Sequence, residues 1–157
     1  MTQIAIACLG TALFVFCARS WRDGTHLVYD TFTGFVTSLF IAQLASEGLE
    51  FRIDGYWIAR AVMVAVLGIA TAGRIIRGWP ISGHLSFVLA IALVQLANPE
   101  LPWFERLFYT LPVPIVLAIR LRKLDQGDHA PTRAAVALSV LCAAPVIFVV
   151  RPWLFVT

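Results

Sequence analysis

The segment from Arg74 to His84 carries the residue types in this chain that are best suited to chemistry. It reads Arg74-Ile-Ile-Arg77-Gly-Trp-Pro-Ile-Ser82-Gly83-His84 and lies between two long apolar runs. The proline and the serine indicate a helix start, with Ser82 as the expected N-cap. The first turn of a helix presents unpaired N–H groups and the positive end of the helix dipole, so it attracts anions. With two arginines just upstream, the segment predicts a seat for a phosphate at a membrane surface.

Three histidines are expected on one side of the fold. His26 is predicted to lie in the loop after the first apolar run, His84 opens the fourth run, and His129 precedes the sixth. A second helix start follows His129, with Thr132 as its N-cap. Two helix N-termini, each with a histidine, should therefore open onto one aqueous face. The histidines share no short ligand spacing, so we expect neither a metal site nor another cofactor.

The composition indicates an integral membrane protein. Of 157 residues, 60% are hydrophobic and only 13% are charged, whereas a soluble domain of this size has about a quarter of its residues charged. The excess of apolar residues must face lipid. The formal charge of +3 is too small to indicate a nucleic-acid partner. The three cysteines lie singly inside apolar runs, which argues against disulfides and zinc clusters.

Six apolar runs predict an all-α bundle of six transmembrane helices in one domain that covers residues 1–157. A crossing helix needs about 20 apolar residues, or fewer where flanking side chains reach the interface. Pro112 and Pro114 should kink the fifth span. The predicted spans are 2–18, 30–46, 53–73, 81–97, 101–119 and 134–150.

The charges of the connecting loops alternate in sign. Loops one, three and five hold eight of the twelve basic residues, and the other loops are mainly acidic. The positive-inside rule therefore places the odd loops in the cytoplasm and both termini outside, most simply in a prokaryotic inner membrane. A second interpretation stays open, because basic residues gathered on one side also bind an anionic substrate.

Two motifs make the second half of the chain resemble the type 2 phosphatidic acid phosphatases, a family of six-helix membrane proteins. The second family motif, a proline–serine–glycine–histidine run at a helix start, is similar to Pro80-Ile-Ser82-Gly83-His84, with one residue inserted. The third motif has an arginine, a histidine and an aspartate, and the same spacing here holds Lys123, His129 and Arg133. The first motif is absent. The resemblance covers roughly residues 74–150.

The resemblance implies a metal-free phosphoryl transfer on an anionic lipid phosphate or diphosphate. His129 would attack phosphorus and form a phosphohistidine, while His84 would protonate the leaving oxygen. The remaining implied contacts are to the phosphate oxygens, from Lys123, Arg77, Arg74, Ser82 and Gly83.

Two departures from the family pattern bear on this activity. Arg133 stands where the family has an aspartate that orients the nucleophilic histidine, and an arginine accepts no hydrogen bond. Asp125 or Asp128 in the same loop are the candidate substitutes. Lys123 in place of arginine also loses the bidentate phosphate geometry. The alternative function is therefore a non-catalytic small subunit that packs lipid, pigment or partner membrane proteins.

Overall fold

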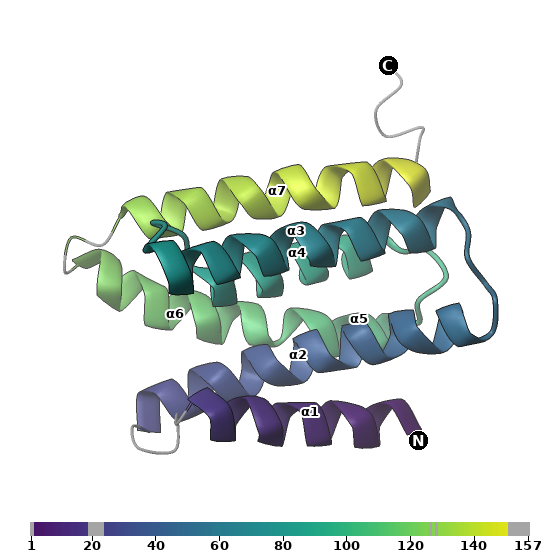
Figure 1. Cartoon of the computed structure of the whole chain (residues 1–157), viewed down its shortest axis with the longest axis horizontal. Helices are drawn as coiled ribbons and strands as arrows, with labels where there is room; N and C mark the ends of the chain where they lie inside the picture. The colour runs from purple at the N-terminus through teal and green to yellow at the C-terminus, as the bar shows by residue number, and fades with distance from the viewer. Residues whose placement is uncertain (1, 19–23, 126, 128, 151–157) are drawn as a thin grey trace.

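Every regular element in the described part of the chain is an α-helix. The structure is a computed structural model that describes residues 2–18, 24–125, 127 and 129–150 (Figure 1). The side chains of residues 2, 17, 18, 25 and 123–125 lie outside this description. The helices are α1 (Thr2–Ala18), α2 (Gly24–Leu49), α3 (Gly55–Arg77), α4 (Gly83–Ala97), α5 (Trp103–Thr110), α6 (Pro112–Asp125) and α7 (Ala130–Val150).

The predicted kink in the fifth span is confirmed as a break between α5 and α6. Leu111 alone separates the two helices, and Pro112 is the first residue of α6. A proline at this position has no N–H to donate back into α5, and its ring excludes the preceding turn. The two helices follow one another along the bundle (Figure 1), so the described residues form six rods from seven helices.

The bundle has two ends with different polar residues. The starts of α2, α4 and α7 and the ends of α3 and α6 form one end (Figure 1). We call it the histidine end, because His26, His84 and His129 lie there. The opposite end comprises the ends of α2 and α4 and the starts of α3 and α5. We call it the glutamate end, after Glu47, Glu50, Glu100 and Glu105.

Two predictions about helix boundaries are wrong. His26 does not lie in a loop, because α2 begins at Gly24 instead of residue 30. Thr132 is not an N-cap, because α7 begins at Ala130, so Thr132 lies in its first turn. In both cases the helix continues beyond the apolar core of the span into polar sequence. Hydropathy locates the part of a helix that contacts lipid, and the hydrogen-bonded helix extends past it.

The central helix of the bundle is α4, which contacts α2, α3, α5, α6 and α7. Its buried residues occur on all sides and include Leu85, Val88, Ile91 and Val94. A helix that is apolar around its whole circumference is typical of a buried position. Because its neighbours screen α4 from lipid, this helix has no need to match the full thickness of the bilayer.

The outer helix α3 presents one face to the core and one to the surroundings. Met63, Leu67 and Ala70 are buried, whereas Val62 and Ile69 are more than half exposed. The Asp54 side chain caps the helix by accepting the Trp57 N–H at 2.7 Å, and Gly78 ends it at a left-handed φ of 69°. An exposed apolar stripe on a well-capped helix is a surface that suits lipid.

The chain is therefore a membrane protein by the length and apolarity of its helices. Three described helices are long and apolar enough to cross a membrane, namely His26–Leu49, Gly55–Arg77 and Ala130–Val150. Two more, Gln3–Phe16 and Gly83–Ala97, are apolar but shorter. The 15 residues of α4 rise about 22 Å, which is less than the hydrocarbon core of about 30 Å.

Two hydrogen-bonded clusters, one helical turn apart on α2, join this helix to α3, α4 and α5 at the glutamate end. Arg60 of α3 is buried, pairs with Glu47 of α2 through both terminal nitrogens, and lies over the Tyr56 ring. Gln43 of α2 accepts from the Gln95 amide of α4 at 3.1 Å and from the Tyr109 hydroxyl of α5 at 3.2 Å. An arginine inside a predicted span either reaches back to the interface or pairs with a carboxylate in the bundle, and Arg60 pairs with Glu47.

Candidate functional site

The histidine end contains an ion-pair geometry that links α4 to α2. His84, the second residue of α4, brings its Nε2 within 2.5 Å of the Asp30 Oδ1. The imidazole is stacked at 4.4 Å on Tyr29 and meets the edge of Phe14 at 6.1 Å, measured between ring centroids. Asp30 is 6% exposed and the His84 side chain is about a third exposed. The pair therefore has one enclosed member and one accessible member.

The start of α4 is held in place by backbone contacts, so the position of His84 is defined. Ser82 occupies the N-cap as predicted, but its hydroxyl does not cap the helix. Its N–H donates to the Pro131 carbonyl at 3.2 Å, which joins the starts of α4 and α7. Gly83 allows close packing of α3, because a Cβ at this position would lie 2.7 Å from the Thr71 hydroxyl.

Hydroxyl and guanidinium groups surround the Asp30–His84 pair. The Tyr29 and Ser82 hydroxyls lie 3.4 Å apart. Arg120 of α6 is buried, and its Nε donates to the Thr132 hydroxyl at 3.1 Å. The charges of Arg120, Asp30 and Arg74 all act on the Tyr29 hydroxyl. The site thus combines one carboxylate, one imidazole and more than one cation, a combination that suits an anion.

A cavity of about 480 Å³ borders His84 on the side of α1. Its walls come from α1, α2 and the start of α4, with Thr71 contributed by α3. Most of the lining is apolar and includes Phe14 and Phe87, and the rim residue Leu13 is 63% exposed. The cavity therefore opens on the lipid-facing surface and has His84, the accessible member of the pair, in its wall, which is an arrangement that suits an amphiphile.

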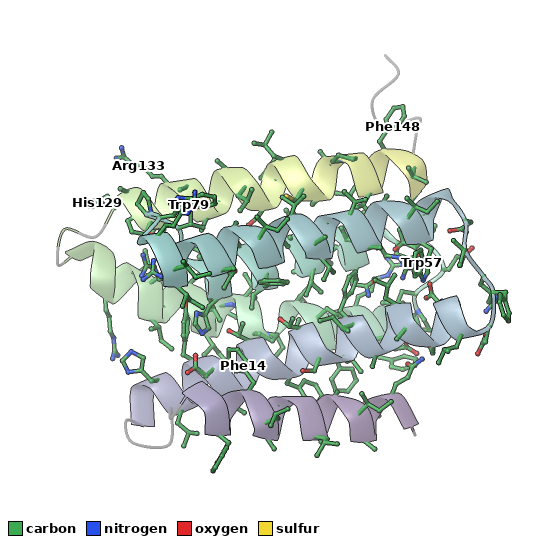
Figure 2. All side chains as sticks on the ribbon, in the orientation of Figure 1. Phe14, Trp57, Trp79, His129, Arg133 and Phe148 are labelled. Carbon is green, nitrogen blue, oxygen red and sulfur yellow. The ribbon has the colours of Figure 1, made fainter. Side chains whose placement is uncertain are left out.

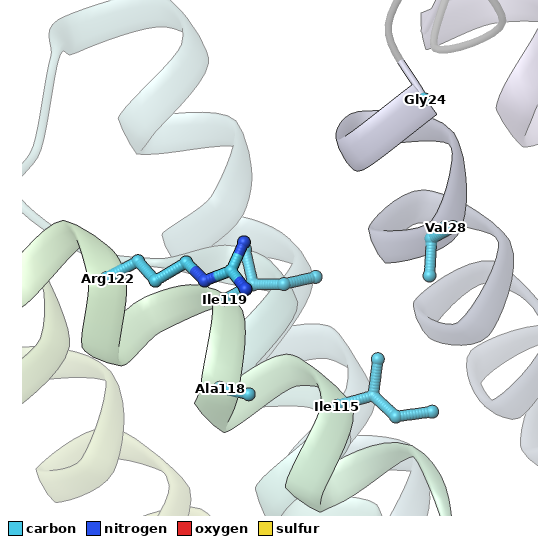
Figure 3. A pocket seen from close by; sticks show the side chains of 6 residues that line it. All are labelled: Gly24, Val28, Ile115, Ala118, Ile119 and Arg122. Atoms are coloured by element: carbon cyan, nitrogen blue, oxygen red, sulfur yellow. The ribbon is translucent and has the colours of Figure 1, made fainter.

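A second cavity, of about 430 Å³, lies between α2 and α6 at the same end of the bundle (Figure 3). Val28, Ile115 and Ile119 form its apolar walls, and Arg122 is the charged residue among its described lining residues. Figure 3 shows the Arg122 side chain extended along α6 past Ile119. An arginine over an apolar groove also suits an anionic amphiphile.

The predicted catalytic histidines lie in different surroundings. His129 is exposed and precedes α7, on the α7 side of the bundle (Figure 2). Phe14, which contacts the His84 ring, is labelled on the opposite, α1 side (Figure 2). The cavity beside His84 is not lined by His129. A reaction that uses both histidines needs one cavity bordered by both of them, and the cavity beside His84 does not meet this requirement.

The predicted phosphate-binding residues divide into three groups. Ser82 and Gly83 lie beside His84, and Gly83 lines its cavity. Arg74 donates to the Ile81 carbonyl at 2.5 Å and so ties down the connection before α4, whereas Arg77 is exposed at the end of α3. The Lys123 side chain, together with the candidate orienting residues Asp125 and Asp128, lies outside the described residues.

Sequence reasoning missed the carboxylate of the site. Asp30 was counted only as the start of a span, although an acidic residue inside an apolar run is a functional signal in a membrane protein. Arg120 was counted with the loop charges, yet it is buried in α6. Asp30 is an ionisable group within a predicted span, and that signal would have identified it, whereas Arg120 lies one residue beyond the predicted fifth span.

Comparisons with protein-family models, with curated proteins and with solved structures give no match. The resemblance to the type 2 phosphatidic acid phosphatases therefore stays a prediction from two short motifs. Any proposal about function has to be argued from the site itself.

Proposed function

We propose that this membrane protein binds a lipid with an anionic phosphate head group at the histidine end. The head group lies against the Asp30–His84 pair and the lipid tail lies in the cavity between α1, α2 and α4. The observation that carries the proposal is the 2.5 Å contact between His84 and Asp30 at one end of an apolar cavity.

The chemistry of the pair favours an anion over a neutral head group. When Nε2–H donates to Asp30, the other ring nitrogen of His84 is available, and protonation makes it an N–H donor. The contact with Asp30 fixes the orientation of the ring, as a carboxylate does behind a catalytic imidazole. Arg120 and Arg74 add positive charge to the surroundings of Tyr29. A phosphate oxygen accepts hydrogen bonds from such donors.

Retention of a radiolabelled diacylglycerol phosphate by the full-length chain in detergent micelles tests this proposal. The wild type should retain this lipid in preference to diacylglycerol, and inorganic phosphate should compete poorly because it lacks a tail. His84→Ala should weaken retention about tenfold, the equivalent of one charge-assisted hydrogen bond. His129→Ala should leave retention unchanged. Equal retention of diacylglycerol and its phosphate by the wild type overturns the proposal.

A second candidate is the phosphatase or phosphotransferase reaction that the resemblance implies. The hydrogen bond from Ser82 to Pro131 favours it, because this bond joins the two helix starts that carry the motif histidines. A His129 nitrogen would donate its lone pair to phosphorus while the phosphate ester bond breaks. The leaving oxygen would take a proton from His84, and water would later cleave the P–N bond. Phosphate release that is lost in His129→Ala distinguishes this enzyme from a lipid-binding bundle, which releases none.

We also propose that all six rods cross the bilayer of a prokaryotic inner membrane, with the histidine end in the cytoplasm. The concentration of basic residues in the odd loops supports this orientation. Local thinning of the bilayer would accommodate α1 and α4. Labelling with a membrane-impermeant maleimide tests it in intact cells: Arg52→Cys should react and Arg77→Cys should not. The reverse pattern contradicts the proposed orientation.

A further inference from the structure

Five Ser and Thr hydroxyls within the described helices are satisfied by the helix backbone. A Ser or Thr inside a membrane helix commonly donates to the carbonyl four residues earlier, because no water is available. The distances from hydroxyl to carbonyl oxygen lie between 2.6 and 3.1 Å. The residues that follow this rule are Thr11, Thr71, Ser86, Thr110 and Ser139.

Thr33 and Thr37 of α2 depart from this rule. Neither hydroxyl has a hydrogen-bond partner, and both oxygen atoms are buried. Thr33 is 4% exposed. The two residues are one helical turn apart, and both line the cavity beside His84. A buried hydroxyl without a partner is costly, so two of them on one cavity wall indicate a polar partner supplied by the occupant of the cavity.

The position of these hydroxyls along α2 defines the part of the occupant that they contact. With a rise of 1.5 Å per residue, Thr33 lies about 4.5 Å and Thr37 about 10 Å along the helix from Asp30. The polar partners therefore lie below the head group, within the apolar part of the cavity. Rotation about χ1 exchanges the threonine hydroxyl and methyl groups, so each hydroxyl has the freedom to turn toward an acceptor.

We infer that the cavity selects an ester-linked diacyl lipid phosphate, with its ester carbonyls hydrogen-bonded to Thr33 and Thr37. In such a lipid the two ester carbonyls follow the phosphate and the glycerol, and the acyl chains continue below them. A carbonyl oxygen accepts a hydrogen bond from a threonine hydroxyl. Ether-linked dialkyl phosphates and polyprenyl phosphates have the same charge but no carbonyl at this depth. This inference rests on the proposed binding of a lipid phosphate and specifies its class.

The experiment compares diacyl, dialkyl and polyprenyl phosphates for retention by the full-length chain in detergent micelles. The wild type should retain the diacyl lipid about tenfold more tightly than the dialkyl lipid, as expected for one to two net hydrogen bonds. Thr33→Val and Thr37→Val keep the side-chain shape and remove the hydroxyl. The double variant should lose the preference by binding the diacyl lipid less tightly, with retention of the dialkyl lipid unchanged.

Thr71→Val provides the matched control. Thr71 lines the same cavity, but its hydroxyl donates to the Leu67 carbonyl at 2.9 Å. This variant should keep the preference of the wild type for the diacyl lipid. If Thr71→Val abolishes the preference as fully as the double variant does, selection does not depend on the two unpartnered hydroxyls, and the inference is wrong.

The outcomes separate this inference from the proposed function. Equal retention of diacyl and dialkyl phosphates by the wild type overturns the ester selection and leaves phosphate binding intact. A wild type that retains no lipid phosphate overturns the proposed function itself, and the inference with it. The thermal unfolding of the double variant shows whether it is folded, and we expect it to be no less stable than the wild type, because two unpartnered buried hydroxyls have been removed.

Discussion

Each end of the bundle holds a pair of ionisable side chains, but the two pairs differ in burial and in surroundings. At the glutamate end the Arg60 side chain is 3% exposed, and the Arg60–Glu47 pair lies one turn of α2 away from the Gln43 cluster, which reaches α4 and α5. At the histidine end the Asp30–His84 pair joins α2 to α4, and the His84 side chain is about a third exposed. A cavity with two unpartnered hydroxyls adjoins that second pair.

Structural and functional polar groups inside a membrane bundle can be separated by their partners and by their accessibility. Groups that bond to one another across several helices fix the relative positions of those helices, and their removal is expected to affect folding. A group that is accessible beside an apolar cavity contributes little to folding and is available for a ligand. Burial of charge alone does not distinguish the two roles, because both ends bury a charge.

Arg60→Met should produce the largest loss of stability. It leaves the Glu47 carboxylate without its partner in a partly buried position. The loss of one member of a buried ion pair costs about 3–5 kcal/mol. The measurement is the free energy of unfolding in detergent micelles.

The double variant Arg60→Met/Glu47→Leu is the control for that prediction. It removes both charges and should recover most of the lost stability, because an apolar pair of similar volume replaces the ions. A double variant that is as unstable as Arg60→Met would mean that the guanidinium stabilises the fold through Tyr56 or through packing instead of through the ion pair.

Gln43→Leu should have an intermediate effect. The Gln43 side chain accepts from both Gln95 and Tyr109, so its loss leaves two buried donors without an acceptor. We expect a cost of about 1–2 kcal/mol in unfolding free energy. Tyr109→Phe removes only one of these bonds together with its donor and should cost less. Equal costs for the two variants would contradict the additive network.

Much of the fold could be predicted from the sequence, because hydropathy and proline act locally. The apolar runs predict every helix that the structure contains, and Pro112 predicts the break between α5 and α6. The ends of α2 and α7 were placed wrongly, since hydropathy records contact with lipid while helices continue into polar sequence. Hydropathy predicts the number of membrane crossings less well than it predicts the helices. The apolar run of α4 is short, and other helices screen it, so its apolarity reflects burial in the bundle as well as contact with lipid.

The site could be predicted only in part, because its main contact is long-range. His84 was singled out by its place at a helix start, but its partner Asp30 is 54 residues away in the sequence. No periodic pattern connects the two positions. His129 was singled out by spacing from a family motif, and the structure leaves it exposed. Short motifs select residue types, whereas the rotation of each helix determines which side chains meet.

His84→Gln should have the smallest effect on stability and a clear effect on the ligand. Glutamine keeps a hydrogen-bond donor near the position of Nε2 and loses the titratable ring. Because the His84 side chain is about a third exposed, we expect a cost below about 1 kcal/mol in unfolding free energy. Retention of the lipid phosphate should nevertheless fall toward that of His84→Ala, since glutamine has no second ring nitrogen for the phosphate. If His84→Gln instead destabilises the protein as much as Arg60→Met, the Asp30–His84 pair is a structural element, and the contrast between the two ends disappears.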